Sequence, residues 1–233
     1  MIDPATPSNR RFNVGLVGLE REPLLLVERM LPDPERLIRS AENLTFAPAF
    51  TAAGGYPGHR APAPRAYVDF MVQALAMPIA KAFGLGSIRP VKADCAFSIV
   101  TLSSKDLAPS QRAPHVDTTN GWQFAILHYL CDSSFGGTSF YRHRATGFET
   151  ITPERQPNYL AVRHSESATD GYVEDGAPWF ERTASIDARF DRVIVYRSRI
   201  LHSGHISNAA RLSAHPRTGR LTANIFATFE PVL

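Results

Sequence analysis

The spacing of apolar residues predicts two helices in the first third of the chain. Residues 35–43 are amphipathic and follow Pro32-Asp33-Pro34, and proline is favoured in the first turn of a helix. Between residues 65 and 83, apolar side chains recur every three or four positions, which is the repeat of a helix with one buried face. Gly84 follows at the position where helices commonly end. We therefore expect helices over 35–43 and 65–83.

The rest of the N-terminal third has little regular pattern. Residues 1–22 are expected to be a polar lead-in, whereas the short apolar run 24–27 predicts a strand. Residues 47–64 are dense in glycine and proline, which interrupt regular structure, so this stretch predicts a loop. Together these patterns predict that residues 1–92 form a helical flank beside the rest of the fold.

From residue 93 onward the chain consists of short runs that favour β-structure, separated by turn residues. Several such runs in succession are typical of a double-sheet jelly roll or sandwich. The expected fold class is mainly β with flanking helices (α+β), with a β core over residues 93–229. The predicted strands are 95–102, 122–131, 138–141, 159–163, 180–186, 192–197 and 221–229.

The composition is typical of a chain that folds as one globular unit. Hydrophobic residues make up 44% of the 233 residues and charged residues 20%, close to the averages for globular domains. Barrels and sandwiches of this length commonly form one domain. We therefore expect residues 1–233 to be a single domain.

Charge and cysteine usage limit the expected partners and compartment. The net charge of +3 comes without a run of like charge, so nucleic acid is not an expected partner. The apolar stretch 23–27 is far too short to cross a bilayer, so neither export nor membrane insertion is expected. Cys95 and Cys131 lie in apolar runs and are expected to be buried free thiols of a cytoplasmic protein. No pattern indicates an oligomeric state.

Pro114-His115-Val116-Asp117 is the strongest local signal for chemistry. In an extended strand, residues i and i+2 project to the same face, so the His115 imidazole and the Asp117 carboxylate converge. One more histidine would complete the facial triad that binds Fe(II) and leaves three coordination positions open. By itself, His-x-Asp is more often a surface pair or a strand-edge hydrogen bond than a metal site.

The further histidine is expected to be His202, which follows the predicted strand 192–197. A jelly roll can bring this position beside the strand that carries His115. His205 would point elsewhere in an extended segment, so we expect it to lie outside the metal ligand set. His115, Asp117 and His202 are therefore the predicted metal ligands and catalytic residues.

Arg220 and Thr222 begin the last predicted strand and share one of its faces. A guanidinium and a hydroxyl so placed can bind the distal carboxylate of a dicarboxylic co-substrate such as 2-oxoglutarate. Its 2-oxo acid end would chelate the iron and leave one position for dioxygen. Tyr129 lies in a buried-looking strand and is either a further donor to 2-oxoglutarate or a packed core tyrosine.

Together, these motifs resemble those of the Fe(II)/2-oxoglutarate-dependent dioxygenases, most closely the prolyl-4-hydroxylase-like branch. Their order and approximate spacing match that family between residues 93 and 229, whereas the N-terminal third shares only the habit of flanking helices. The resemblance rests on His115-Val116-Asp117, on residues 135–141 (FGGTSFY), on Tyr196-Arg197-Ser198 followed by Leu201-His202-Ser203-Gly204, and on Gly219-Arg220-Leu221-Thr222.

The resemblance implies a double-stranded β-helix fold with Fe(II) and 2-oxoglutarate as cofactors. It also implies a hydroxylase that oxidises a C–H bond of an amino acid, peptide or small metabolite and releases succinate and CO₂. A carboxylate ligand at Asp117 implies hydroxylation or desaturation rather than halogenation. The chain departs from the branch because lysine is common there at the position of Arg220, and because residues 208–218 are inserted before it. Arg211 in this insertion is the alternative carboxylate anchor.

Two other functions fit parts of the pattern. A metal-dependent hydrolase would use the same ligands to activate water, but it lacks a clear general base and gives Arg220 no role. A non-catalytic β-sandwich binding module would make the His-x-Asp pair accidental. Failure to bind Fe(II) would indicate the binding module.

Overall fold

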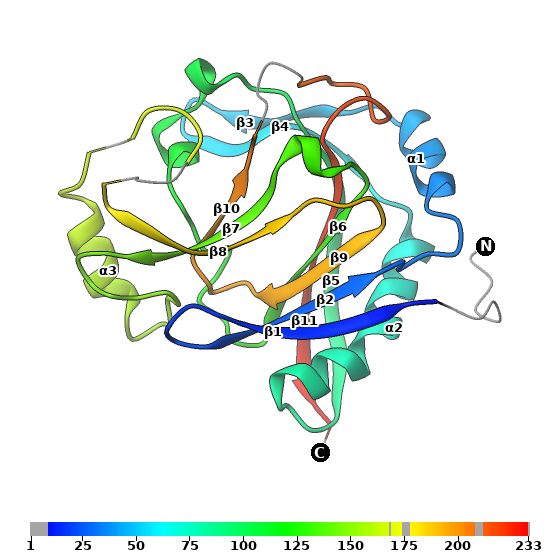
Figure 1. Cartoon of the computed structure of the whole chain (residues 1–233), viewed down its shortest axis with the longest axis horizontal. Helices are drawn as coiled ribbons and strands as arrows, with labels where there is room; N and C mark the ends of the chain where they lie inside the picture. The colour runs from blue at the N-terminus through cyan, green and yellow to red at the C-terminus, as the bar shows by residue number, and fades with distance from the viewer. Residues whose placement is uncertain (1–8, 168, 174–177, 208–211, 233) are drawn as a thin grey trace.

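A computed structural model describes residues 9–167, 169–173, 178–207 and 212–232. Figure 1 shows two layers of β-structure, with helices beside the larger sheet. This is the mainly β, jelly-roll-like architecture expected from the sequence, so the predicted fold class is confirmed.

Every strand pairing in the two sheets is antiparallel. The larger sheet has the order β1-β2-β9-β6-β11-β5-β4-β3, and the smaller sheet has the order β10-β7-β8. In chain order the strands are β1 (Arg11–Val17), β2 (Glu22–Glu28), β3 (Ala47–Thr51), β4 (Gly54–Pro62), β5 (Ile88–Val100), β6 (Gln123–Tyr129), β7 (Gly137–His143), β8 (Phe180–Asp187), β9 (Arg192–Arg197), β10 (His202–His205) and β11 (Leu221–Pro231).

Helices of two kinds connect the strands. The α-helices are α1 (Glu35–Glu42), α2 (Arg65–Phe83) and α3 (Gln156–Arg163). The short 3-10 helices are η1 (Ser104–Asp106), η2 (Pro109–Arg112) and η3 (Ser133–Phe135).

The alternation of side chains along β11 gives the larger sheet two different faces. Ala223 and Ile225 are fully buried in the core that α1 and α2 form with the sheet. Thr222, Asn224 and Phe226 alternate with them and line a cavity on the opposite face. The two faces of the sheet therefore separate the apolar core from the candidate site.

A second apolar cluster fills the space between the two sheets. It includes Phe140 of β7 and Ile194 and Tyr196 of β9. The Tyr196 ring contacts Phe140 edge to face, at a centroid distance of 5.1 Å. This packing holds the smaller sheet, which carries His202, against the larger one.

Most of the element predictions are confirmed. The helix expected at 65–83 is α2, and the helix expected at 35–43 is α1. Six of the seven strands predicted after residue 93 correspond to strands of the structure. The strand predicted at 159–163 is wrong, because these residues belong to α3. Its short apolar run fits either element, and Pro157 in the first helical turn favours the helix.

The prediction of a helical flank over residues 1–92 is wrong. Residues 11–17, expected to be part of a polar lead-in, form the edge strand β1, and most of its side chains are exposed. Residues 47–64, expected to be a loop, contain the hairpin of β3 and β4. Gly54 and Gly55 have positive φ at its turn, so glycine shapes the hairpin there instead of interrupting it. The N-terminal third thus completes both ends of the larger sheet.

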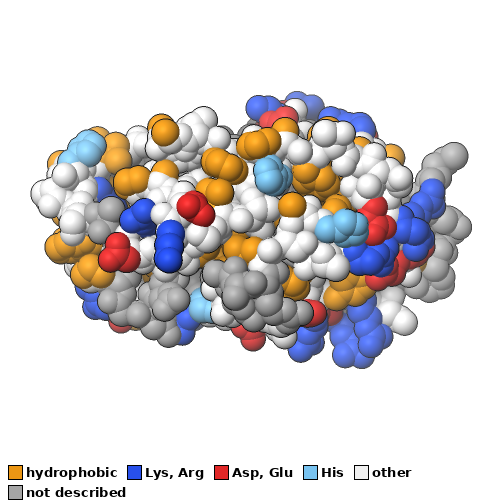
Figure 2. Space-filling view, turned by 90° about the horizontal axis from the view of Figure 1, so that it is seen from above, with side chains coloured by type: hydrophobic (Ala, Val, Ile, Leu, Met, Phe, Trp, Pro, Cys, Tyr) orange, Lys and Arg blue, Asp and Glu red, His pale blue; other side chains and the backbone are white. Residues whose placement is uncertain are grey.

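Other expectations concern the surface and the thiols. None of the helices within the described residues is long and apolar enough to cross a membrane. Cys95 and Cys131 are both free, as expected, but only Cys131 is buried, whereas Cys95 is partly exposed. On the face shown in Figure 2, basic and acidic side chains lie near one another, with no continuous basic stripe.

Candidate active site

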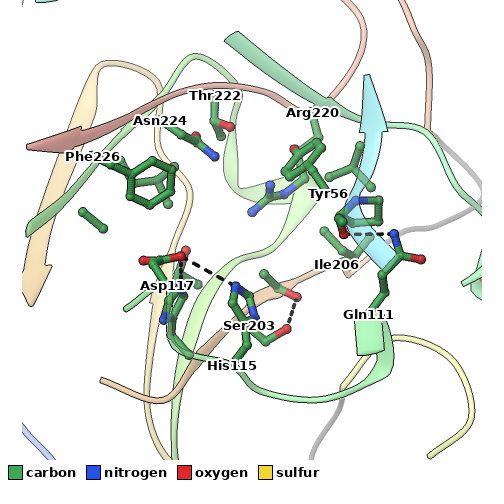
Figure 3. A pocket seen from close by; sticks show the side chains of 18 of the residues that line it. Tyr56, Gln111, His115, Asp117, Ser203, Ile206, Arg220, Thr222, Asn224 and Phe226 are labelled. Carbon is green, nitrogen blue, oxygen red and sulfur yellow. Dashed lines mark hydrogen bonds and ion pairs between the residues drawn. The ribbon is translucent and has the colours of Figure 1, made fainter. Parts of the chain in front are cut away.

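A cavity of about 350 Å³ opens between the concave face of the larger sheet and the smaller sheet. Its walls come from β4, β6, β9, β10 and β11 and from the segment that carries His115 (Figure 3). Five of the six predicted site residues line it, namely His115, Asp117, His202, Arg220 and Thr222.

The backbone places the two predicted metal histidines beside each other. The amide of His115 donates to the carbonyl of His202 at 2.9 Å, and the amide of His202 donates to the carbonyl of His115 at 2.9 Å. The amide of Asp117 donates to the Ser198 carbonyl at 2.9 Å. These bonds fix the segment that carries His115 and Asp117 against the chain before and within β10.

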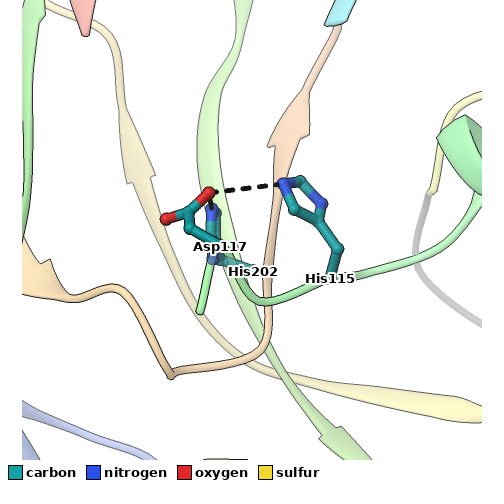
Figure 4. A group of neighbouring side chains, drawn as sticks. All are labelled: His115, Asp117 and His202. Carbon is teal, nitrogen blue, oxygen red and sulfur yellow. Dashed lines mark ion pairs between the residues drawn. The ribbon is translucent and has the colours of Figure 1, made fainter. Parts of the chain in front are cut away.

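The side chains of His115, Asp117 and His202 converge, as Figure 4 shows. Each offers one ligand atom, and the three atoms lie within 4.8 Å of one another. Asp117 Oδ1 is 3.9 Å from His115 Nε2 and 3.8 Å from His202 Nε2. Within the described part of the chain, this is the only cluster of histidine, cysteine and acidic side chains with such a geometry.

The protonation states suit metal binding. Nδ1 of His202 lies 2.9 Å from the Ile200 carbonyl, to which it donates, so the lone pair is on Nε2, which faces Asp117. Burial lowers the pKa of His202 to about 4. The protein around His115 excludes water from its ring, which lowers the pKa of His115, and the neighbouring His202 lowers it further. Both imidazoles are therefore neutral near pH 7, as metal ligands must be.

The residues fit a divalent transition metal. Two imidazole nitrogens and one carboxylate on one side of a site form the ligand set of non-haem Fe(II) enzymes. Asp117 Oδ2 is buried and has no hydrogen-bond partner among the described residues. A bound cation would satisfy this carboxylate, whose pKa burial raises when no cation is present.

Arg220 brings a buried positive charge into the same cavity. Its exposed fraction is 4%, and Nη2 donates to the Gly137 carbonyl at 2.6 Å. Nε is buried without a hydrogen-bond partner, and no described acidic side chain forms an ion pair with Arg220. A buried guanidinium without a carboxylate partner is costly unless a ligand supplies the negative charge.

Thr222 and Tyr129 differ in whether they line the cavity that contains the Arg220 guanidinium. Thr222 lines the cavity two residues after Arg220, and its hydroxyl makes only a 3.4 Å contact with the Ser98 carbonyl. Tyr129 is fully buried outside the cavity lining, and its hydroxyl lies 2.6 Å from that of Thr138. Its role as a 2-oxoglutarate donor stays a prediction.

Three other histidine and arginine residues bear on the assignment of the site. Arg211, the alternative anchor, lies outside the described residues. His205 lies outside the metal cluster, as expected. His128 is a fully buried core histidine between the Tyr67 hydroxyl and the Asp191 carboxylate, each at 3.0 Å.

Sequence reasoning missed two residues of the β3–β4 hairpin that line the cavity, Tyr56 and Arg60. The Tyr56 hydroxyl is buried and unpartnered within the described structure. Figure 3 shows Tyr56 next to Arg220. Burial raises the pKa of the phenol, and the positive charge of Arg220 opposes this shift. The alternating pattern of Tyr56, Gly58 and Arg60 was the available signal, but it lies in the stretch interpreted as a loop.

The two sheets form a double-stranded β-helix, a fold that is also found in a solved 2-oxoglutarate-dependent enzyme. The epimerase SnoN of nogalamycin biosynthesis, a non-haem α-ketoglutarate-dependent enzyme, superposes with a TM-score of 0.52 at 14% identity, over 90% of this chain and 79% of that one. HygX from Streptomyces hygroscopicus, with nickel and 2-oxoglutarate bound, superposes with a TM-score of 0.53 at 14% identity, over 90% and 83% of the two chains. At this identity, the similarity establishes the fold.

The sequence, and not the structure, identifies the family of this chain. Residues 8–227 match DUF6445, a family of unknown function, and the chain belongs to it. No curated protein matches the chain.

Proposed function

We propose that the protein is a non-haem Fe(II)- and 2-oxoglutarate-dependent oxygenase that hydroxylates a C–H bond of a small metabolite, amino acid or peptide and releases succinate and CO₂. The observation that carries this proposal is the pairing, in one cavity, of the His115–Asp117–His202 cluster with Arg220, a buried cation without an acidic partner among the described residues. A metal-dependent hydrolase would not need this arginine.

Each part of the cavity would have a separate task. His115, Asp117 and His202 would hold the metal, which supplies the activation of dioxygen when bound. Arg220 would bind the distal carboxylate of 2-oxoglutarate, with the hydroxyl groups of Thr222 and Tyr56 as further donors. The apolar side chains that line the cavity beside them, such as Phe226, would keep water from the reacting groups.

The comparisons support the proposal through proteins of the same fold. One structure of HygX holds nickel, 2-oxoglutarate and hygromycin B, and SnoN is an epimerase. Neither description names a hydroxylation, so we base hydroxylation here on the sequence motifs and on the carboxylate of Asp117. The same motifs support placement in the prolyl-4-hydroxylase-like branch, and the free thiols Cys95 and Cys131 suit a cytoplasmic location.

An anaerobic titration tests the proposal. Metal-free protein receives Fe(II) and then 2-oxoglutarate while visible absorption is recorded, and a charge-transfer band that requires both additions is expected. Arg220→Gln should raise the 2-oxoglutarate concentration at half-saturation about tenfold or more, because a hydrogen bond to a charged group contributes about 1.5–3 kcal/mol.

Arg65→Gln is the matched control. It removes the same charge from an exposed ion pair with Asp69 on α2 and should leave the titration unchanged. Bound iron without a band would indicate the hydrolase, and no iron binding would indicate the non-catalytic binding module.

A further inference from the structure

A second guanidinium lies in the cavity, contributed by Arg60 of β4. Nε of Arg60 donates to the Ser98 hydroxyl at 3.1 Å, and its guanidinium carbon lies 4.5 Å from the centroid of the Tyr56 ring. Like Arg220, Arg60 has no ion pair with any acidic side chain of the described chain. The side chain is held in place while its charge stays uncompensated.

Tyr56 lies beside both guanidinium groups. Its ring contacts Arg60, and Figure 3 shows it next to Arg220. Arg60 lines the same cavity as His115 and Asp117, and both Arg60 and His115 are partly exposed, whereas Arg220 is 4% exposed. Arg220 therefore serves the inner end of the cavity, and Arg60 serves its more open part, which His115 also lines.

A count of formal charges shows that Arg60 is in excess in the proposed complex. A divalent metal and Arg220 supply three positive charges, and Asp117 with a 2-oxoglutarate dianion supplies three negative ones. The two histidines are neutral. Arg60, which is always protonated, adds a positive charge that nothing in this complex balances.

The wall that carries Arg60 is braced by η2. Gln111 Nε2 donates to the Gly55 carbonyl at 3.0 Å, and the Ser110 hydroxyl donates to the Ala53 carbonyl at 2.9 Å. Gln111 Oε1 also accepts from the Ala108 amide at 2.8 Å. The hairpin is thereby fixed beside the cavity, so Arg60 is presented by a supported strand and not by a free loop.

We propose that Arg60 binds an anionic group of the primary substrate, a carboxylate, sulfate or phosphate, beside the metal cluster. This inference rests on the proposed function, because it assumes that 2-oxoglutarate occupies the end of the cavity that Arg220 serves. It assigns the substrate to the class of small anions and makes Arg60 a determinant of specificity.

The test uses inorganic sulfate as the probe, because it is a small dianion. Metal-free protein is loaded anaerobically with Fe(II) and 2-oxoglutarate, and sulfate binding is then measured by isothermal titration calorimetry while the charge-transfer band is monitored. We expect wild type to bind sulfate with the band retained. Arg60→Gln should weaken sulfate binding about tenfold or more while its 2-oxoglutarate titration stays within about twofold of wild type. Arg65→Gln should match wild type in both.

Three results would overturn the inference. The first is no uptake of sulfate by the loaded wild type, and the second is equal binding of sulfate by Arg60→Gln and wild type. The third is a loss of 2-oxoglutarate affinity in Arg60→Gln as large as that in Arg220→Gln, which would assign Arg60 to the co-substrate. Absence of the band in wild type is a separate failure, because it would remove the proposed function on which the inference rests.

Discussion

His115 and His202 exchange both of their backbone hydrogen bonds, although 87 positions separate them in the chain. Their ring centroids are 4.6 Å apart. The peptide groups, and not the imidazoles, thus hold the two segments together, so this pairing does not depend on either side chain.

Replacing His115 should therefore affect metal binding much more than folding. His115→Ala is expected to abolish the band that requires Fe(II) and 2-oxoglutarate, and to change the Tm of the metal-free protein by no more than about 2 °C, because the ring is half-exposed and the backbone bonds stay. His202→Ala should cost about 1–3 kcal/mol, since the buried ring and its hydrogen bond to Ile200 are lost. Thermal unfolding in a chelator measures both, and unfolding of His115→Ala at low temperature would contradict the expectation.

Arg220 should stabilise the complex and destabilise the ligand-free protein. Arg220→Met keeps most of the side-chain volume but removes a buried charge that lacks an acidic partner among the described residues. We expect a ligand-free Tm at least as high as that of wild type, together with a loss of the stabilisation that 2-oxoglutarate gives in the presence of metal. A clear fall in the ligand-free Tm would mean that the bond to the Gly137 carbonyl outweighs the buried charge.

Tyr56→Phe tests whether the hairpin of β3 and β4 contributes to 2-oxoglutarate binding. The ring that supports Arg60 remains, and only the buried hydroxyl is removed. We expect half-saturation by 2-oxoglutarate to rise about fivefold, since one neutral hydrogen bond contributes about 1 kcal/mol. An unchanged titration would exclude the Tyr56 hydroxyl as a donor.

The thiol of Cys131 should make the free energy of unfolding decrease at alkaline pH. Burial raises the pKa of its thiol from 9.0 to about 11, so between these values the unfolded chain loses a proton that the native state retains. The contribution of the Cys131 thiol to the free energy of unfolding is fully present below pH 9. It falls by on the order of 2 kcal/mol as the pH rises through 11. The free energy of unfolding of wild type should fall more steeply over this interval than that of Cys131→Ala. Parallel slopes for the two proteins would exclude the thiol as the cause.

The parts of the fold that the sequence predicted are those encoded by local periodicity. The repeat over residues 65–83 specifies α2, and the alternation after Arg220 specifies which side chains of β11 face the core. His115 and Asp117 could be paired because a separation of two in an extended chain places them on one face. His202 required the further assumption of a jelly roll, because no local pattern brings it to His115.

The missed parts depend on long-range pairing. Phe12, Val14 and Leu16 alternate in β1, but they lie at an exposed sheet edge, so no burial pattern distinguishes this strand from a lead-in. Prolines in β3 and β4 obscured the hairpin, although proline is tolerated near a sheet edge. Arg60 could not be assigned to the cavity without the pairing of β4 with β5, in which it lies opposite Ser98.

The hairpin of β3 and β4 is separate in the chain from every predicted metal ligand, and β3 forms one edge of the larger sheet. Replacement or lengthening of an edge hairpin leaves the pairing of the central strands intact. Related chains could therefore acquire different substrates by exchanging residues 47–62 while keeping the predicted metal ligands unaltered. Transplanting this hairpin between such chains would be a direct route to altered substrate choice.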